Sequence, residues 1–346
     1  MAISCQPLHR ELWAERLMAW EIWMKQNNSA GLKLFLCTLF VFWSFFVISC
    51  ADTAEKAAMG VVVITHGAPI PQWNETIMRL IGTVESPYPV EPAFLEFDKE
   101  RTLAQAAKRL EDKGITEILI VHLSPSSYSS HHEEVRYLAG LRKDLGVYTE
   151  DAGKPPPSKS VFAVSPCMDD HPLVVEIMKD YARELSQDPA QESLMLVGHG
   201  PVEELENIMW VRQLEKIGQE IKKELPFKEV ACMTLRADAA DLVREQAHED
   251  VRKTALRLSA HGRVIVVICG VGIKMLQFEL QHLFKGIPSV VINQKAIINH
   301  PNAKKWIEAT IQKGMQQPEV PPVNRKWSIM DQVTGKPAGT NRYGLL

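Results

Sequence analysis

Two stretches with the same ending decide the fold: GVVVITHG at 60–67 and SLMLVGHG at 193–200. Each is a short, continuous apolar run that ends in His-Gly. Continuous rather than alternating apolar residues are typical of a strand that helices bury on both faces. We therefore expect each stretch to be a central strand of a parallel sheet, with His66 or His199 at the carboxyl end, where α/β proteins bind ligands.

The same alternation of strands and helices follows each stretch. Further strands are predicted at 90–97, 117–124 and 160–166, and then at 229–236, 263–270 and 289–296. Helical spacing of apolar residues predicts helices at 72–82, 102–114, 131–141 and 172–185, and then at 203–225, 241–260, 273–284 and 302–313. The sequence thus predicts an α/β protein of two duplicated, doubly wound domains, each with a parallel four-stranded sheet.

Turn-forming residues separate the two halves. The segment SQDPAQE at 186–192 has no apolar period. We expect an N-terminal domain at 59–188 and a C-terminal domain at 192–315. Residues 316–346 are rich in proline and aperiodic, which is typical of an extended tail.

The N-terminal part has the composition of a targeting segment. Residues 34–49, LFLCTLFVFWSFFVIS, carry no charge, but they are fewer than the roughly 20 residues of a membrane-spanning helix. The ending VISC resembles a bacterial lipobox, so we expect residues 1–50 to direct export and Cys50 to carry a lipid anchor at the periplasmic face of the membrane. An uncleaved signal anchor is the alternative, and Met24 is an alternative start.

Composition excludes several classes of protein. The chain of 346 residues is 46% hydrophobic and 23% charged, which excludes wholesale disorder. A net charge of −3 excludes a strongly basic chain that coats nucleic acid, and we expect no nucleic-acid partner. The sequence also lacks a phosphate-binding GxxxxGK[ST] loop, a GxSxG nucleophile elbow and an HExxH zinc motif.

The cysteines predict no structural zinc site, because no CxxC spacing occurs. Outside the targeting segment, Cys167, Cys232 and Cys269 remain. Cys232 and Cys269 lie in predicted strands and are interpreted as small core residues. A single disulfide between two of the three stays open.

The loop after the third strand of the first half, SSYSSHHEE at 126–134, is the second candidate for chemistry. Its serines suit a helix N-cap, and its glutamates suit the positive end of a helix. Capping does not explain His131 and His132, which makes them candidate ligands.

These motifs together carry a resemblance to a family. VVVITHGAP at 61–69, VEPAFLEF at 90–97, and the continuous run 102–134 resemble the CbiX group of class II chelatases, over roughly 60–315 in its two-lobed long form. The group includes sirohydrochlorin cobaltochelatase and ferrochelatase. The resemblance implies ATP-independent insertion of a divalent metal (cobalt, iron or nickel) into a tetrapyrrole such as sirohydrochlorin. The metal is a substrate, and no prosthetic group is expected.

The resemblance also implies the site residues. His66 matches the first metal-binding and catalytic histidine and His131 the second, while a shift of one residue in the alignment would select His132 instead. Two imidazoles, with Glu96 as a further candidate, would leave coordination positions open for pyrrole nitrogens. A neutral histidine also suits the uptake of pyrrole protons near neutral pH. The sequence departs from the family at Ala68, where serine is usual, and at His122, where proline is common.

The two halves are predicted to differ in role. Alignment of the third strands places Phe278 and Glu279 opposite the paired histidines, so the first half is expected to carry the metal. The second half would form one wall of an apolar cleft, with His199 beside the tetrapyrrole. An exported, non-catalytic carrier of metal, haem or another tetrapyrrole on the same fold is the alternative function.

Overall fold

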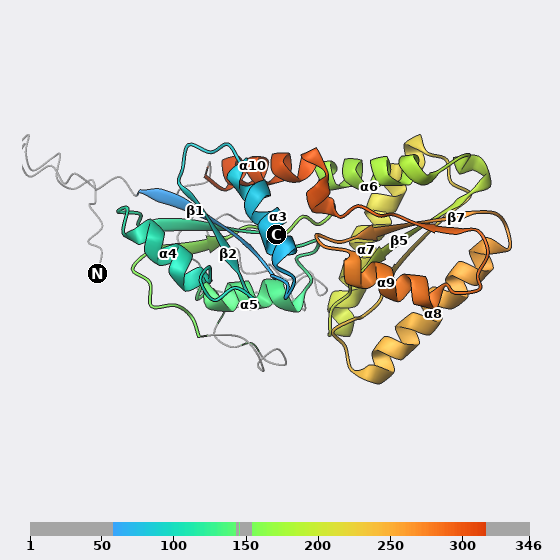
Figure 1. The fold of residues 1–346 in the computed structure, drawn as a ribbon, viewed down its shortest axis with the longest axis horizontal. Coiled ribbons are helices and arrows are strands. Elements are labelled where there is room, and N and C mark those ends of the chain that lie inside the picture. Colours follow the sequence, from blue (N-terminus) through green and yellow to red (C-terminus); the bar gives the residue numbers. More distant parts are fainter. Residues whose placement is uncertain (1–57, 143–144, 146–153, 316–346) are drawn as a thin grey trace, which may run out of the picture. The chain divides into compact units, whose positions relative to one another are not determined.

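The computed structural model describes residues 58–142, 145 and 154–315 (Figure 1). The predicted targeting segment with Cys50 and the predicted tail at 316–346 lie outside these residues. Within the described ranges, every helix is too short or too polar to cross a bilayer.

The first half contains one parallel sheet in the strand order β2-β1-β3-β4. Its strands are β1 (Met59–Thr65), β2 (Val90–Phe94), β3 (Glu117–His122) and β4 (Val161–Val164). The helices that connect them are α3 (Pro71–Gly82), α4 (Leu103–Glu111) and α5 (Ser130–Leu138). Residues 61–64 of β1 are fully buried, because α4 and α5 cover one face of the sheet while α3 lies against the other.

The second half repeats this arrangement in the order β6-β5-β7-β8, again with every pair parallel. Its strands are β5 (Ser193–Gly198), β6 (Glu229–Thr234), β7 (Val264–Cys269) and β8 (Val290–Ile292). The helices α7 (Glu204–Glu224), α8 (Asp241–Ser259) and α9 (Lys274–Leu283) connect them. The identical strand orders confirm the predicted duplicated α/β fold.

The last helix of each half packs on the sheet of the other half. Helix α6 (Pro172–Leu185) follows β4 in the chain but contacts β7 and α7 of the second half. Helix α10 (Pro301–Met315) follows the second sheet but contacts β3 of the first. A Cβ atom on Gly314 of α10 would lie 2.6 Å from the Leu119 side chain of β3, so a larger residue there would displace that side chain. One continuous apolar core therefore includes one face of the first sheet and both faces of the second.

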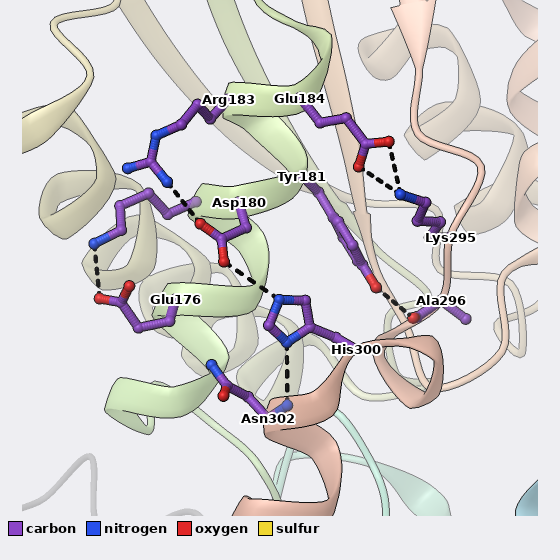
Figure 2. Close-up of polar contacts among 10 residues, drawn as sticks. Glu176, Asp180, Tyr181, Arg183, Glu184, Lys295, Ala296, His300 and Asn302 are labelled. Carbon is purple, nitrogen blue, oxygen red and sulfur yellow. Dashed lines mark hydrogen bonds and ion pairs between the residues drawn. The ribbon is translucent and has the colours of Figure 1, made fainter.

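Polar contacts fasten α6 to the segment that leads into α10 (Figure 2). This segment contains the 3-10 helix η3 (Ile297–Asn299). A further 3-10 helix among the described residues, η2 (Pro189–Gln191), precedes β5. The hydroxyl of Tyr181 donates to the carbonyl of Ala296 at 2.8 Å, and Lys295 pairs with Glu184 at 2.6 Å. The imidazole Nε2 of His300 lies 3.3 Å from a carboxylate oxygen of Asp180. These contacts hold the chain where it returns to the first half.

The shared core predicts that the two halves unfold together. Trp306 of α10 is 1% exposed, and Trp306→Ala should lower the free energy of unfolding by about 3–5 kcal/mol. We expect a single urea transition by far-ultraviolet circular dichroism, shifted as a whole. Leu242→Ala, at a side chain that is 81% exposed, is the control and should change stability by less than about 0.5 kcal/mol. Two separate transitions, with only one of them shifted, would contradict this prediction.

Candidate active site

His66 lies at the carboxyl end of β1 and is held by its neighbour. The backbone of Gly67 has φ +99°, and a Cβ atom there would lie 2.1 Å from the carbonyl oxygen of Glu96. Only glycine fits this turn. It brings the Gly67 carbonyl to 2.8 Å from Nδ1 of His66, which donates to it. The proton is thereby fixed on Nδ1, and Nε2 keeps its lone pair.

His131, in the first turn of α5, lies beside His66. The two ring centroids are 4.3 Å apart, with an angle of 65° between the planes. Ser129 is the N-cap of α5, as the sequence predicted, and its side chain accepts from the backbone N–H of His132. Nδ1 of His131 lies 3.6 Å from the carboxylate of Glu134. The structure therefore brings the first two predicted metal ligands together.

His132 lies in a different cluster. It is 4% exposed, with its Nδ1 3.2 Å from Nδ1 of His122 and 3.2 Å from the sulfur of Cys167. Successive residues of an α-helix point about 100° apart, so only one of two adjacent histidines can face the cleft. Of the two candidates, it is His131 that meets His66.

Glu96 lies beside His66 because the pairing of β2 with β1 continues past the strand. Its backbone N–H donates to the carbonyl of His66 at 2.8 Å. Its carboxylate lies 3.6 Å from Nε2 of His66, and both side chains are 37% exposed. Phe97 follows at φ +60°, a conformation that costs energy for a bulky residue. Its ring is 54% exposed and lies 6.0 Å, centroid to centroid, from that of His66.

His199 repeats the geometry of His66 in the second half. Gly200 has φ +87°, and its carbonyl lies 3.2 Å from Nδ1 of His199. The same nitrogen lies 3.5 Å from the carboxylate of Asp238. The negative charge of Asp238 also favours protonation of His66 and His131, so one carboxylate influences all three histidines.

Sequence reasoning missed Asp238 and the contact that Glu134 makes with His131. A signal for Asp238 was present, because it closely follows β6, at the carboxyl edge next to His199. Glu134 was attributed only to the helix terminus. Both carboxylates add acceptor groups to the pair of histidines.

The two histidines differ in proton affinity. Burial, together with the nearby His131, lowers the pKa of His66. Burial alone would also lower the pKa of His131, but the nearby Glu134 carboxylate and the charges of Asp238 and Glu96 outweigh it and raise this pKa. The pair therefore provides one imidazole that stays neutral and one that holds a proton more readily.

The second half provides exposed apolar side chains instead of a second imidazole pair. Leu242, Met275 and Phe278 are 81%, 79% and 73% exposed in the first turns of α8 and α9. The adjacent Glu279 pairs with His248 at 2.6 Å. The loop before α9 contacts the first half, since a Cβ atom on Gly272 would lie 2.5 Å from the Trp73 indole nitrogen.

A pocket of about 570 Å³ lies beside His66 in the first half. It combines an aromatic ring, apolar side chains, two guanidinium groups and two carboxylates. Its lining residues are Ala68, Pro69, Pro71, Asn74, Glu75, Met78, Arg79, Phe97, Asp98 and Arg101.

The burial of His132 predicts acid sensitivity. Burial, with the nearby Arg136 charge, lowers the pKa of His132 to about 3. The unfolded chain therefore takes up a proton below a pH of about 6.5 that the folded chain does not, and stability falls as the pH falls. The free energy of unfolding by urea, measured in the presence of a chelator, should fall as the pH is lowered from about 6 to about 4. In His132→Leu, the slope of this free energy against pH should be smaller by up to about 1.4 kcal/mol per pH unit. His282→Leu, at an exposed histidine, should keep the wild-type slope. Equal slopes for His132→Leu and wild type would contradict the prediction.

Comparisons with known proteins identify relatives of this chain. A model of the CbiX family matches residues 60–185. A curated sirohydrochlorin cobaltochelatase from Saccharolobus islandicus (strain M.14.25 / Kamchatka #1) is 30% identical over 87 residues, which are 25% of this chain and 67% of the relative. The solved structure of SirB from Bacillus subtilis with Fe³⁺ superposes with a TM-score of 0.54 at 15% identity. It covers 74% of this chain and 94% of SirB, and at that identity the likeness concerns the fold alone.

The family match lies in the first half, which contains both His66 and His131. Together with the sequence relative and the shared fold, it establishes the family. This chain belongs to the CbiX family of class II chelatases.

Proposed function

We propose that the protein inserts a divalent metal ion into a tetrapyrrole such as sirohydrochlorin, without ATP. One observation carries this proposal: His66 and His131 meet at a sheet edge while Nδ1 of His66 is tied to a carbonyl. Nε2 of His66 then faces the Glu96 carboxylate at 3.6 Å. Two acceptor atoms at this distance attract a cation, and their partial exposure leaves it accessible to a second substrate.

The number of ligands suits a metal that is passed on. A structural site surrounds its ion with about four protein ligands, whereas a catalytic site keeps positions open. His66, His131 and Glu96 supply three donors or fewer, so pyrrole nitrogens can replace water on the ion. The Nδ1–carbonyl bond fixes the orientation of the His66 ring during this exchange.

The same site can accept protons. Metal insertion displaces two pyrrole N–H protons, which need a base close to the ring. His131 is suited to this role, because Glu134, Asp238 and Glu96 raise its pKa. Once the metal has left its lone pair, the imidazole can take these protons in turn near neutral pH and pass each of them to a carboxylate or to solvent.

The flat macrocycle requires apolar surface next to the metal. Phe97 lies beside His66, and Met275, Phe278 and Leu242 are exposed on the second half. Rings of this kind gain free energy when apolar side chains cover their faces. Arg79 of the neighbouring pocket, whose side chain is 70% exposed, can pair with a carboxylate group at the rim of sirohydrochlorin, whereas Arg101 already pairs with Asp98 at 2.7 Å.

Cobalt, iron and nickel are the candidate metals. The related archaeal enzyme is named for cobalt, and the SirB structure was solved with Fe³⁺. Imidazole and carboxylate donors suit all three as divalent ions, and the order of their affinities follows the metal more than the protein. Parallel assays with each ion are therefore needed.

The proposal predicts multiple turnovers and unequal roles for the histidines. His66→Ala and His131→Ala should each reduce the rate of insertion into sirohydrochlorin about 100-fold, because each removes a ligand or base. His199→Ala should chiefly raise the KM for the tetrapyrrole, since the second half forms a wall of the site. His282→Ala, an exposed histidine of α9, is the matched control and should keep the wild-type rate.

The same assay separates an enzyme from a carrier. Metallated product in excess over protein supports the chelatase. Binding of one equivalent without turnover would instead support an exported metal or tetrapyrrole carrier. Equal losses in His199→Ala and His66→Ala, with unchanged circular dichroism, would mean that the metal bridges both halves.

We propose further that the mature chain is exported and anchored by lipid on Cys50. The uncharged run at 34–49 and the VISC ending support this location. Cys50→Ala should block processing, so the precursor accumulates at higher mass in fractionated cells. Identical mass and membrane partition for variant and wild type would favour an uncleaved signal anchor instead.

A further inference from the structure

We propose that His122, His132 and Cys167 form a second metal site, which holds a transition-metal ion of the zinc and cobalt class inside the core. The three side chains are 1%, 4% and 4% exposed. Each offers a ligand atom to the same small volume. This site differs from the candidate active site in its donors, its burial and its role.

The donor atoms form a nearly equilateral triangle. Nδ1 of His122 and Nδ1 of His132 are 3.2 Å apart, and the sulfur of Cys167 lies 3.4 Å and 3.2 Å from them. The point equidistant from three such atoms is about 1.9 Å from each, close to zinc–nitrogen lengths of about 2.0–2.1 Å. An ion slightly out of the donor plane also approaches the zinc–sulfur length of about 2.3 Å with little side-chain movement.

Three separate elements bring the ligands together. His122 is the last residue of β3, His132 lies in the first turn of α5, and Cys167 follows β4. The two imidazole planes are within 5° of parallel, with centroids 5.4 Å apart, and their Nδ1 atoms lie 3.2 Å from each other. Such convergence needs a fixed backbone at each element.

Surrounding polar groups hold the cysteine in place. The backbone N–H of Cys167 donates to the hydroxyl of Ser127 at 2.9 Å, and this hydroxyl donates to Asp169 at 2.7 Å. Gln213 of α7 donates to the same carboxylate at 2.8 Å. Outer contacts of this kind orient ligands in metal sites. The second half therefore supports a site built by the first.

The donor set selects the class of ion. A thiolate and two imidazoles favour borderline and soft transition metals over magnesium or calcium. On binding, the thiol of Cys167 loses its proton to solvent, and the thiolate offsets one charge of a divalent ion. The negative charges of the Asp169 and Glu133 carboxylates affect the thiol of Cys167 electrostatically. The positive charge of Arg136 affects the imidazole of His132 in the same way.

The position of the site indicates its role. The ion would link β3, α5 and the loop after β4. Its ligand on α5, His132, is the residue that follows His131 in the chain. The ion would therefore fix the helix terminus that presents His131 to His66. Both candidate sites supply about three protein donors, so burial and the thiolate, rather than the number of ligands, would slow the exchange of this ion and distinguish it from a metal that is handed to a tetrapyrrole.

Cobalt provides a direct test, because a cobalt–thiolate bond absorbs in the near ultraviolet and imidazole–cobalt bonds do not. Co²⁺ is supplied both during expression and to the purified full chain, so that burial does not prevent loading. We expect one equivalent of thiolate-bound cobalt in wild type. Cys167→Ser should abolish the band, and His122→Gln, which keeps the thiol, should lose most of it.

Two controls make the assignment specific. Cys269→Ser removes another buried free cysteine and should keep the band. The double variant His66→Ala/His131→Ala removes the candidate active site and should also keep it, independently of any loss of chelatase activity. Absence of the band from wild type in both loading regimes, or its persistence in correctly folded Cys167→Ser, would overturn the proposal and identify the cluster as a metal-free hydrogen-bonded group.

Discussion

The exchange of α6 and α10 between the halves is the constraint on which the site depends. Each helix covers apolar surface of the sheet that it does not follow in the chain, and polar contacts around Tyr181 and His300 fasten the two helices together. Separation of the halves would expose this core to water, at a cost that grows with the apolar area. The carboxyl edges of the two sheets are therefore held close to each other. As a result, the negative charge of Asp238 in one half affects the pKa values of His66 and His131 in the other.

Both halves contain the same local arrangement of a histidine and a glycine at the end of a strand, but the residues around it differ between the halves. His66 and His199 each follow a central strand, and each directs Nδ1 to the carbonyl of the next glycine. In the first half, His131 completes an imidazole pair. In the second half, the aligned position is Phe278, whose ring is 73% exposed. Duplication thus supplied two equivalent edges, of which one suits a metal ion and the other suits the face of a flat apolar ring.

The sequence predicted the strands, the duplication of the two halves and the position of His66 at the end of a strand, because these features depend on local patterns. A continuous apolar run identifies a buried strand, and glycine after histidine identifies a turn at its end. The choice between His131 and His132 could not be made from the pattern, since it depends on the residue at which α5 begins. The packing of α6 was also hidden: its apolar stripe predicts a buried face but not the sheet that buries it. Cys167 gave no signal, because its partners His122 and His132 are 45 and 35 residues away.

Two clusters of histidine so close together raise the question of how one chain would keep two metals apart. Exposure separates them: the side chains of His66 and His131 are 37% and 29% exposed, whereas His122 and His132 are 1% and 4% exposed as residues. Chemistry separates them as well, because only the buried cluster contains a thiol. An ion between Glu96 and His66 can exchange its water for pyrrole nitrogens, but an ion beside Cys167 must first break a thiolate bond inside the core. In these two proposals, adjacent residues of one helix have opposite roles: His131 would release a metal, and His132 would retain one.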